Sequence, residues 1–129
     1  MLDTNIASDL IRNPGGRAAG HLANRGVAGI CISIMTAAEL RYGAERRNSR
    51  RLSLEVDGFL ARIEVMPFDQ PADAAYGRLR AALTAAGTPI GPIGCLIAAH
   101  ALALQARLVT DNVREFSRAP GLMIENWLA

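Results

Sequence analysis

Four acidic residues occupy positions where a folded chain could bring carboxylates together. Asp3 ends an apolar stub at the start of the chain, and Glu39 lies in the first turn of an expected helix. Asp111 and Glu115 come just after a late apolar run. Because acids at the ends of parallel strands converge at one edge of a sheet, these four could form one site. Carboxylates suit Mg²⁺, which can activate a bound water against a phosphodiester, so the pattern favours metal-assisted hydrolysis.

Each acid also has a purely structural interpretation. Thr36 and Glu39 have the spacing of a capping box, in which both side chains bond to free amides at a helix start. Asp111 could cap a short helical turn together with Asn112, and Asp3 could hydrogen-bond within its own turn. Asp3 is the hardest to explain in this way, since a carboxylate at the end of an apolar strand loses hydration unless it gains a partner.

The elements expected to position these acids alternate along the chain. Short apolar runs rich in β-branched residues predict strands over 30–34, 63–66, 108–110 and 122–124, with a stub over 1–3. Helical spacing predicts helices over 6–11, 17–24, 37–46, 51–61, 72–86 and 95–106, and Gly91 and Pro92 set up entry into the last of them. We therefore expect one α/β domain over 1–129, with a mainly parallel central sheet flanked by helices on both faces.

The composition indicates a compact domain outside the membrane. The chain has 129 residues, of which 50% are hydrophobic, enough for one core. It has no uncharged apolar run of about 18 residues, which a membrane span would need. The first residues show no secretory signal, so we expect a cytoplasmic protein. Cys31 and Cys95 form no paired Cys-x-x-Cys motif, which argues against a zinc site, and both are expected in the core.

All 14 basic residues are arginine. Arginine enrichment suits phosphate recognition, but it is also typical of GC-rich coding sequences, and the net charge of +2 is too small to diagnose nucleic-acid binding. The absence of lysine is more informative. It excludes a Walker A loop, a Schiff-base lysine and a pyridoxal phosphate anchor, because each of these requires an ammonium group.

Several short motifs follow one another along the chain. They are LDTNI at 2–6, AELRYG at 38–43, GTPIG at 87–91, LIAAHA at 96–101, VTDN at 109–112 with REFSR at 114–118, and the ending over 120–127. In this order and at these separations they resemble the successive motifs of PIN-domain VapC toxins. The resemblance covers essentially the whole chain.

The resemblance implies a PIN-like fold and an endoribonuclease that depends on Mg²⁺ or Mn²⁺. Such a protein is the toxin half of a type II toxin–antitoxin pair, is held inactive by a VapB antitoxin, commonly forms a homodimer, and cuts structured RNA, often tRNA. By the resemblance, Asp3 and Glu39 match the first two metal-binding acids, and Asn112 falls at the fourth position. Asp111 and Glu115 would then be auxiliary acids. The residues expected to tune the geometry around them are Thr4, Asn5 and Thr110.

One position departs from the family pattern. The third acid should stand two residues before Leu96, and there the chain has Gly94. The neighbouring Cys95 is no obvious substitute, since a thiolate is a soft ligand and points about 100° away around a helix. Losing a ligand carboxylate should weaken metal binding and strongly reduce turnover. We therefore expect an endoribonuclease fold that is inactive or strongly impaired in this chain.

Two other functions remain open at this stage. The chain could be a non-catalytic PIN module that binds antitoxin or RNA. It could also be a phosphotransfer domain that uses Asp3, although the missing lysine and Asn5, where a second acid would be useful, disfavour this.

The densest positive cluster lies on or just after the expected helix that carries Glu39. Its members are Arg41, Arg46, Arg47, Arg50 and Arg51. Near a group of acids they could bind RNA phosphates or an acidic antitoxin segment, although a solvated helix face is an equal alternative. Within the LIAAHA motif, His100 is expected to be a packed, hydrogen-bonded histidine rather than a general base. No local motif surrounds His21, which we expect on the surface.

Overall fold

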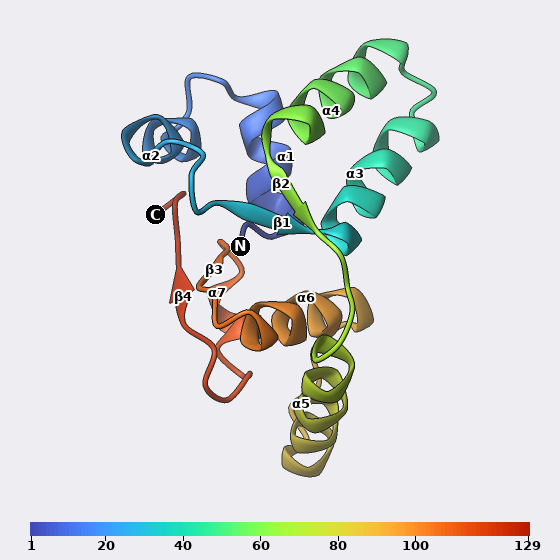
Figure 1. The fold of residues 1–129 in the computed structure, drawn as a ribbon, viewed down its shortest axis with the longest axis vertical. Helices are drawn as coiled ribbons and strands as arrows, with labels where there is room; N and C mark the ends of the chain where they lie inside the picture. The colour runs from blue at the N-terminus through green and yellow to red at the C-terminus, as the bar shows by residue number, and fades with distance from the viewer.

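The computed structural model describes residues 1–129 as helices that surround four short strands (Figure 1). The helices are α1 (Thr4–Arg12), α2 (Arg17–Arg25), α3 (Ile34–Arg46), α4 (Arg50–Arg62), α5 (Ala72–Ala86), α6 (Pro92–Ala103) and α7 (Val113–Phe116). The strands are β1 (Cys31–Ser33), β2 (Glu64–Met66), β3 (Leu108–Val109) and β4 (Ile124–Glu125).

The strands form a parallel arrangement whose centre is Leu2. Strand β1 pairs with β2 in parallel, and β3 pairs with β4 in parallel. Leu2 joins the two pairs through parallel bridges to Ile32 on one side and Val109 on the other. The expected parallel sheet is therefore confirmed, with the N-terminal stub as its middle strand.

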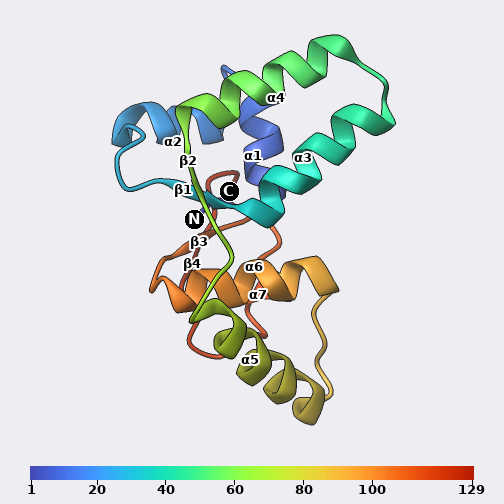
Figure 2. The same ribbon diagram turned by 45° about the vertical axis from the view of Figure 1, so that its right-hand side comes forward.

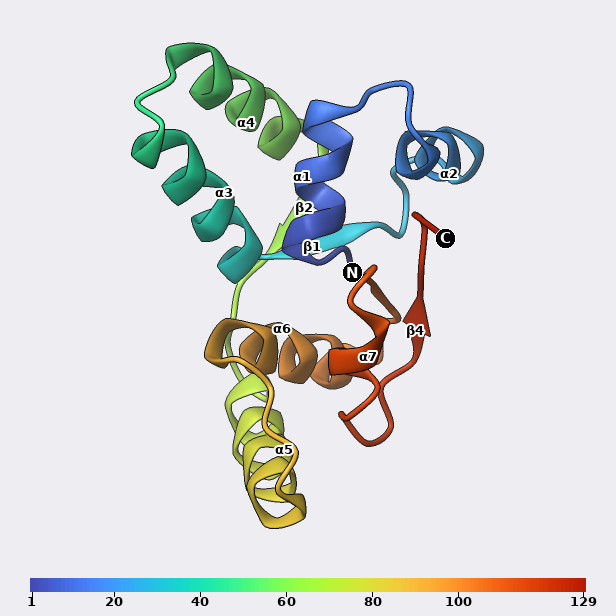
Figure 3. The same cartoon turned by 180° about the vertical axis from the view of Figure 1, so that it is seen from behind.

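Side chains that alternate along the strands supply two cores, one on each face of the sheet. Leu2, Ile32 and Val109 belong to a cluster that includes buried residues of α1 to α4. Met1 and Leu108 belong to a second cluster with α5, α6 and Phe116. Figures 2 and 3 show α1, α3 and α4 on one side of the strands and α5 and α6 on the other. The expectation of helices on both faces is thus confirmed, and it follows from the period of two along a strand.

Helix α3 begins earlier than the sequence pattern predicts. Its N-cap is Ser33, whose hydroxyl accepts a hydrogen bond from the amide of Met35 at 3.1 Å. Thr36 lies within the helix and is fully buried, so the predicted capping box with Glu39 is wrong. The prediction failed because serine and threonine can both act as N-caps, and β1 ends at Ser33, three residues before the predicted cap.

Helix α6 also starts upstream of its predicted range. Gly91 is the N-cap and Pro92 the first helical residue, as the sequence suggested, and the helix ends at Ala103 rather than at residue 106. The shift places Gly94 inside the first turn. The helix is very apolar but has only 12 residues, and no helix of the protein is both long and apolar enough to cross a membrane. Within α6, Cys95 is buried, whereas Cys31 in β1 is only partly so.

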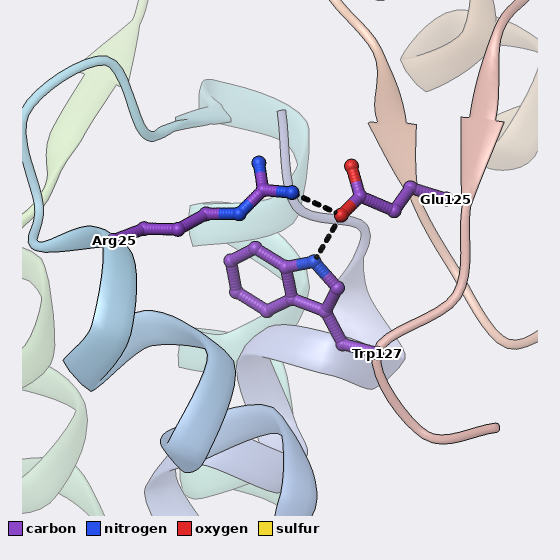
Figure 4. Close-up of polar contacts among 3 residues, drawn as sticks. All are labelled: Arg25, Glu125 and Trp127. Carbon is purple, nitrogen blue, oxygen red and sulfur yellow. Dashed lines mark hydrogen bonds and ion pairs between the residues drawn. The ribbon is translucent and has the colours of Figure 1, made fainter.

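The C-terminal segment is fastened to α2 through Trp127, which is completely buried (Figure 4). Its indole N–H donates to Glu125 Oε1 at 3.0 Å, and the same oxygen forms an ion pair with Arg25. Arg25 also lies over the indole ring, with its guanidinium carbon 5.7 Å from the centroid. The exposed His21 stacks on the indole with ring centroids 5.5 Å apart. The ending of the chain is therefore part of the first core.

His100 is a packed, hydrogen-bonded histidine, as predicted. It is 1% exposed, its Nδ1 lies 2.8 Å from the hydroxyl of Ser33, and the rings of Phe68 and His100 meet edge to face. Because Ser33 caps α3, this contact ties α6 to the start of α3. Burial lowers the pKa of His100, while the carbonyl of Pro67 and the charge of Asp69 oppose the shift.

The lowered pKa of His100 predicts a loss of stability in mild acid. The unfolded chain takes up a proton at this histidine near its ordinary pKa of about 6.5, whereas the folded chain takes it up only at lower pH. This contribution is therefore complete above about pH 6.5 and is lost as the pH falls. Urea denaturation at pH 7.5 and 5.5 should show a larger loss for the wild type than for His100→Gln. The variant should itself be less stable at pH 7.5 by about 1–3 kcal/mol. Equal losses in the two proteins would contradict the prediction.

Candidate active site

A cavity of about 350 Å³ opens where the chain leaves the central strands. Asp3 follows Leu2, Glu39 projects from α3, and Gly94 lies in the first turn of α6. Asn112 and Glu115, which follow β3, also line the cavity. Residues that are far apart in the sequence thus meet at the carboxyl ends of parallel strands, where the sequence predicted a site.

Asp3 is the buried acid of the cavity. The residue is 4% exposed and serves as the N-cap of α1, where its Oδ1 accepts a hydrogen bond from the amide of Ile6 at 2.9 Å. Burial raises the pKa of Asp3, and the nearby charge of Asp111 adds to the rise. The hydroxyl of Thr110 and the amide of Ile6 act in the opposite direction. A carboxylate with so little hydration favours either a proton or a cation as partner.

Glu39 is oriented by two threonines. The hydroxyl of Thr4 donates to Glu39 Oε1 at 2.6 Å, and the hydroxyls of Thr4 and Thr36 lie 3.3 Å apart. Thr4 is the first residue of α1 and follows Asp3 directly. The residue that orients Glu39 is therefore the neighbour of the other acid. Thr4 was predicted to support the site geometry, and its hydrogen bond to Glu39 is a direct contact of that kind. Sequence reasoning missed Thr36 because it assigned this residue to the helix cap.

Glu115 holds the start of α6 in place. Its Oε1 accepts a hydrogen bond from the amide of Gly91 at 2.9 Å, and its Oε2 accepts one from the side-chain amide of Asn112 at 2.6 Å. The negative charge stands at the positive end of the α6 dipole, which is a favourable arrangement. Both carboxylate oxygens of Glu115 therefore already accept a hydrogen bond, whereas the side-chain oxygen of Asn112 accepts none.

Gly94 leaves the α6 side of the cavity without a ligand atom. A Cβ at this position would lie 3.1 Å from Ile90 Cγ2 and 3.5 Å from Phe116 Cζ. The first distance is tight, so a larger residue fits only if the Cγ2 methyl group of Ile90, which is attached directly to Cβ, moves by a few tenths of an ångström. The helix backbone itself does not require glycine, because Gly94 has no left-handed conformation.

The donor atoms of the cavity suit a hard divalent cation in type but are few. Asp3, Glu39 and Glu115 supply carboxylate oxygens and Asn112 an amide oxygen, which match Mg²⁺ or Mn²⁺ better than softer metals, and of the three acids Glu115 is the one that holds the start of α6. No group of three or more histidine, cysteine or acidic side chains lies close enough together to hold a metal ion. Mg²⁺ is often held by only one or two carboxylates together with waters. Asp3 and Glu39 therefore fit such an ion, with less ligand charge than a three-acid site would offer.

The remaining predicted site residues lie around this cavity. Asn5 lines it, whereas Thr110 is fully buried beside Asp3. Asp111 is exposed and lies close enough to affect the pKa of Asp3, but it does not line the cavity. Asp111 was predicted to be an auxiliary acid of the site, and it has no direct contact with the cavity.

The arginine cluster divides into two groups. Arg46, Arg47 and Arg51 line a groove of about 470 Å³ between α1, α3 and α4. This groove shares Thr4, Asn5 and Glu39 with the acidic cavity. The other two predicted arginines do not line it: Arg41 bonds to Asp57 at 2.8 Å, and Arg50 stands at the start of α4.

Arg12 of α1 also lines the groove and was missed at the sequence level. A signal was present, since Asn5, Ser8 and Arg12 have the spacing of one helix face and all three line this groove. The arginine was overlooked because it is remote in sequence from the dense cluster after Glu39.

The burial of Asp3 predicts that Asp3→Asn stabilises the protein at neutral pH. Asparagine is an equally good N-cap, so the bond from Ile6 is kept while the buried charge is removed. Since the pKa of Asp3 is raised by folding, ionisation destabilises the native state as the pH rises above the unfolded value of about 3.9. The unfolding midpoint of the variant should exceed that of the wild type at pH 7.5, and the difference should vanish near pH 3.5.

Asp57→Asn is the matched control for this measurement. It removes an exposed carboxylate whose ion pair with Arg41 contributes little, so its midpoint should stay close to the wild-type value. If Asp3→Asn is less stable than the wild type at pH 7.5, the burial of Asp3 does not make its ionised form unfavourable, and the prediction is wrong.

Comparison with known proteins places this geometry in a family. A family model described as a PIN domain matches residues 1–122. A tRNA(fMet)-specific endonuclease VapC from Salmonella typhimurium is 41% identical over 131 aligned residues, which cover 98% of this chain and 96% of the relative. A protein of the same description from Shigella flexneri is also 41% identical, with 98% of this chain and 96% of the relative covered.

Solved structures agree with these sequence matches. The crystal structure of DNA-bound VapBC from Salmonella typhimurium contains a chain with a TM-score of 0.91 and 41% identity, covering 98% of this chain and 96% of that one. VapBC2 from Rickettsia felis, bound to a DNA fragment from its promoter, gives a TM-score of 0.90 and 36% identity, with coverage of 98% and 97%. This chain therefore shares the fold of the matched chains.

Proposed function

The chain belongs to the PIN-domain VapC ribonuclease family, and from this premise we propose that the cavity around Asp3 and Glu39 is the active site of a divalent-metal-dependent endoribonuclease. The substrate class is structured RNA, and tRNA(fMet) is the first candidate because relatives at 41% identity are named for it. The protein would act in the cytoplasm, where tRNA is found.

The observation that carries this proposal is that Asp3 and Glu39 open onto one cavity. A carboxylate as buried as Asp3 is costly for a fold that gains nothing from its charge. The oxygen-only donor set is the chemistry used to bind Mg²⁺ at phosphoryl centres. A phosphotransfer domain that uses Asp3 is not supported, since the relatives are named as an endonuclease and a ribonuclease.

In this function the chain's own residues bind and orient. Asp3 and Glu39 would hold the cation, and Thr4 keeps one oxygen of Glu39 in place. Glu115 and Asn112 fix the first turn of α6 against the cavity. When bound, the metal would supply an acidified water and neutralise charge that develops on the phosphate.

Gly94 makes this an impaired version of the site. The side of the cavity formed by α6 offers no carboxylate, so both the affinity for metal and the charge available to orient it are reduced. We propose weak metal binding and low turnover in this chain, without loss of the fold.

A second candidate function is a non-catalytic module that binds antitoxin or RNA. The specific observation in its favour is that Gly94 offers no carboxylate on the α6 side of the cavity, and that no group of three or more histidine, cysteine or acidic side chains is placed to hold a metal ion. Tight binding to an antitoxin with no RNA cleavage even at high Mn²⁺ concentration would favour this function over an impaired nuclease.

The proposed partner is a small VapB-like antitoxin. The structures of the relatives are toxin–antitoxin complexes, and those from Salmonella typhimurium and Rickettsia felis also hold DNA. We propose that this chain forms an equivalent pair in which the antitoxin restrains the nuclease. Homodimerisation remains a prediction from the family resemblance.

Gly94→Asp should restore metal-dependent cleavage. The new carboxylate would stand at a residue that lines the cavity, in the first turn of α6, and add the missing ligand charge. We expect a rise in Mn²⁺-dependent cleavage of tRNA(fMet) on the order of 100-fold, the scale set by one electrostatic group at a reacting centre. Expression of the variant without an antitoxin should arrest growth.

Gly94→Ala is the matched control for this experiment. It introduces the same Cβ, with the same close approach to Ile90, but no carboxylate, and its cleavage rate should therefore stay at the low wild-type level. If Gly94→Asp folds and binds Mn²⁺ by calorimetry yet neither cuts RNA nor slows growth, the nuclease assignment is wrong.

A further inference from the structure

We propose that the groove lined by Arg12, Arg46 and Arg47 binds the backbone phosphates of an RNA strand next to the acidic cavity. The inference rests on the proposed function, because it assigns a substrate path to the same site. It goes further in naming the residues that hold the strand and the direction from which it arrives.

The groove and the acidic cavity adjoin each other. Thr4, Asn5 and Glu39 line both, so a strand in the groove lies next to the carboxylates. The groove runs between α1, α3 and α4, which together contribute its entire lining apart from Arg47 and Ser49 in the α3–α4 connection. With a volume of about 470 Å³, it is larger than the acidic cavity.

The groove carries uncompensated positive charge. Four arginines and two glutamates line it. Glu55 is paired with Arg51 at 2.9 Å, whereas Glu39 accepts a bond from the neutral hydroxyl of Thr4 and keeps its charge, so the lining carries a formal net charge of +2. Arg12, Arg46 and Arg47 are exposed and take part in none of the ion pairs of the protein. Three guanidinium groups are therefore free to bind anions, and guanidinium binds phosphate in a two-pronged geometry.

The lining favours a polyanion over a docked helix. A helix binds in a groove through apolar anchors, but here Leu40 and Val56 are buried beneath the surface and only Ile11 and Leu52 are partly accessible. The accessible groups are arginines together with the polar side chains of Asn5, Ser8 and Ser49. Such a surface offers hydrogen bonds to phosphate and ribose oxygens, as sequence-independent RNA contacts require.

The experiment measures RNA binding in EDTA, so that cleavage is not involved. The probe is a fluorescent single-stranded RNA of about 12 nucleotides, and its affinity is measured between about 50 and 200 mM salt. Relative to the wild type, Arg46→Gln/Arg47→Gln should bind on the order of tenfold more weakly at the middle of this range. Its salt dependence should be shallower by about 1.4 in the log–log slope, the amount expected for two lost phosphate contacts.

Arg62→Gln/Arg78→Gln is the matched control. It removes the same net charge from exposed positions on α4 and α5 that do not line the groove, so its affinity and slope should stay at the wild-type values. Arg12→Gln alone should weaken binding without changing the melting temperature of the protein. Because Arg12 comes from a different helix, its effect tests the path across the groove rather than one end of α3.

Three outcomes would overturn the proposal. In the first, the wild type binds no RNA even at about 50 mM salt. In the second, both double variants lose the same affinity, which would mean that overall charge controls binding. In the third, the groove variant binds RNA normally but loses affinity for an oligoglutamate peptide, which would identify a docking surface for an acidic protein segment.

These results are separable from the test of the nuclease. If Gly94→Asp cuts RNA while the groove variants bind like the wild type, the strand lies elsewhere and only the path is wrong. If the groove variants lose RNA binding while Gly94→Asp cuts nothing, the groove assignment stands and the nuclease assignment fails.

Discussion

The pairing of Leu2 on both sides is the constraint on which the rest of the structure depends. Its bridges to Ile32 and Val109 place the N-terminal stub at the centre of the sheet, and they leave Asp3 as the first residue beyond it. The amide of Asp3 is held by the carbonyl of Val109 at 2.9 Å, and its carboxylate caps α1. Because these bonds hold both its backbone and its side chain, Asp3 cannot turn out into water. Its negative charge therefore has to be neutralised within the cavity, by a proton or by a cation.

The main features of the fold were predictable because they depend on patterns that repeat. Apolar runs identified the strands, and their alternation with helices indicated a parallel sheet covered on both faces. The ends of α3 and α6 were not predictable in the same way, because a cap depends on where the preceding strand ends. Ser33 rather than Thr36 caps α3, since pairing with β2 stops at Ser33. This moves Glu39 into the second turn, where Thr4 rather than the helix start is its partner.

The candidate site was predictable in its acids and less so in its supporting groups. Family motifs pointed to Asp3, Glu39 and the gap at Gly94, all of which line one cavity. No local pattern shows that Thr36 stands behind Thr4, or that both oxygens of Glu115 are taken up by Gly91 and Asn112. Those contacts join elements that are distant in the sequence, and they exist only once the sheet has set the distances between helices.

The contacts that hold the α6 segment around Gly94 do not involve a metal ligand, so the fold at this site does not require the catalytic chemistry. The first turn of α6 is held by Glu115 and packs on Ile90 and Phe116, so it does not depend on a metal ligand at position 94. Without metal, a carboxylate at position 94 would add negative charge to the cavity that Asp3 lines, and the pKa of Asp3 is already raised by burial. Glycine at this position therefore relieves an electrostatic cost to the fold and removes ligand charge from the same place. The stability of the free protein and its capacity to hold a cation are opposed at this residue.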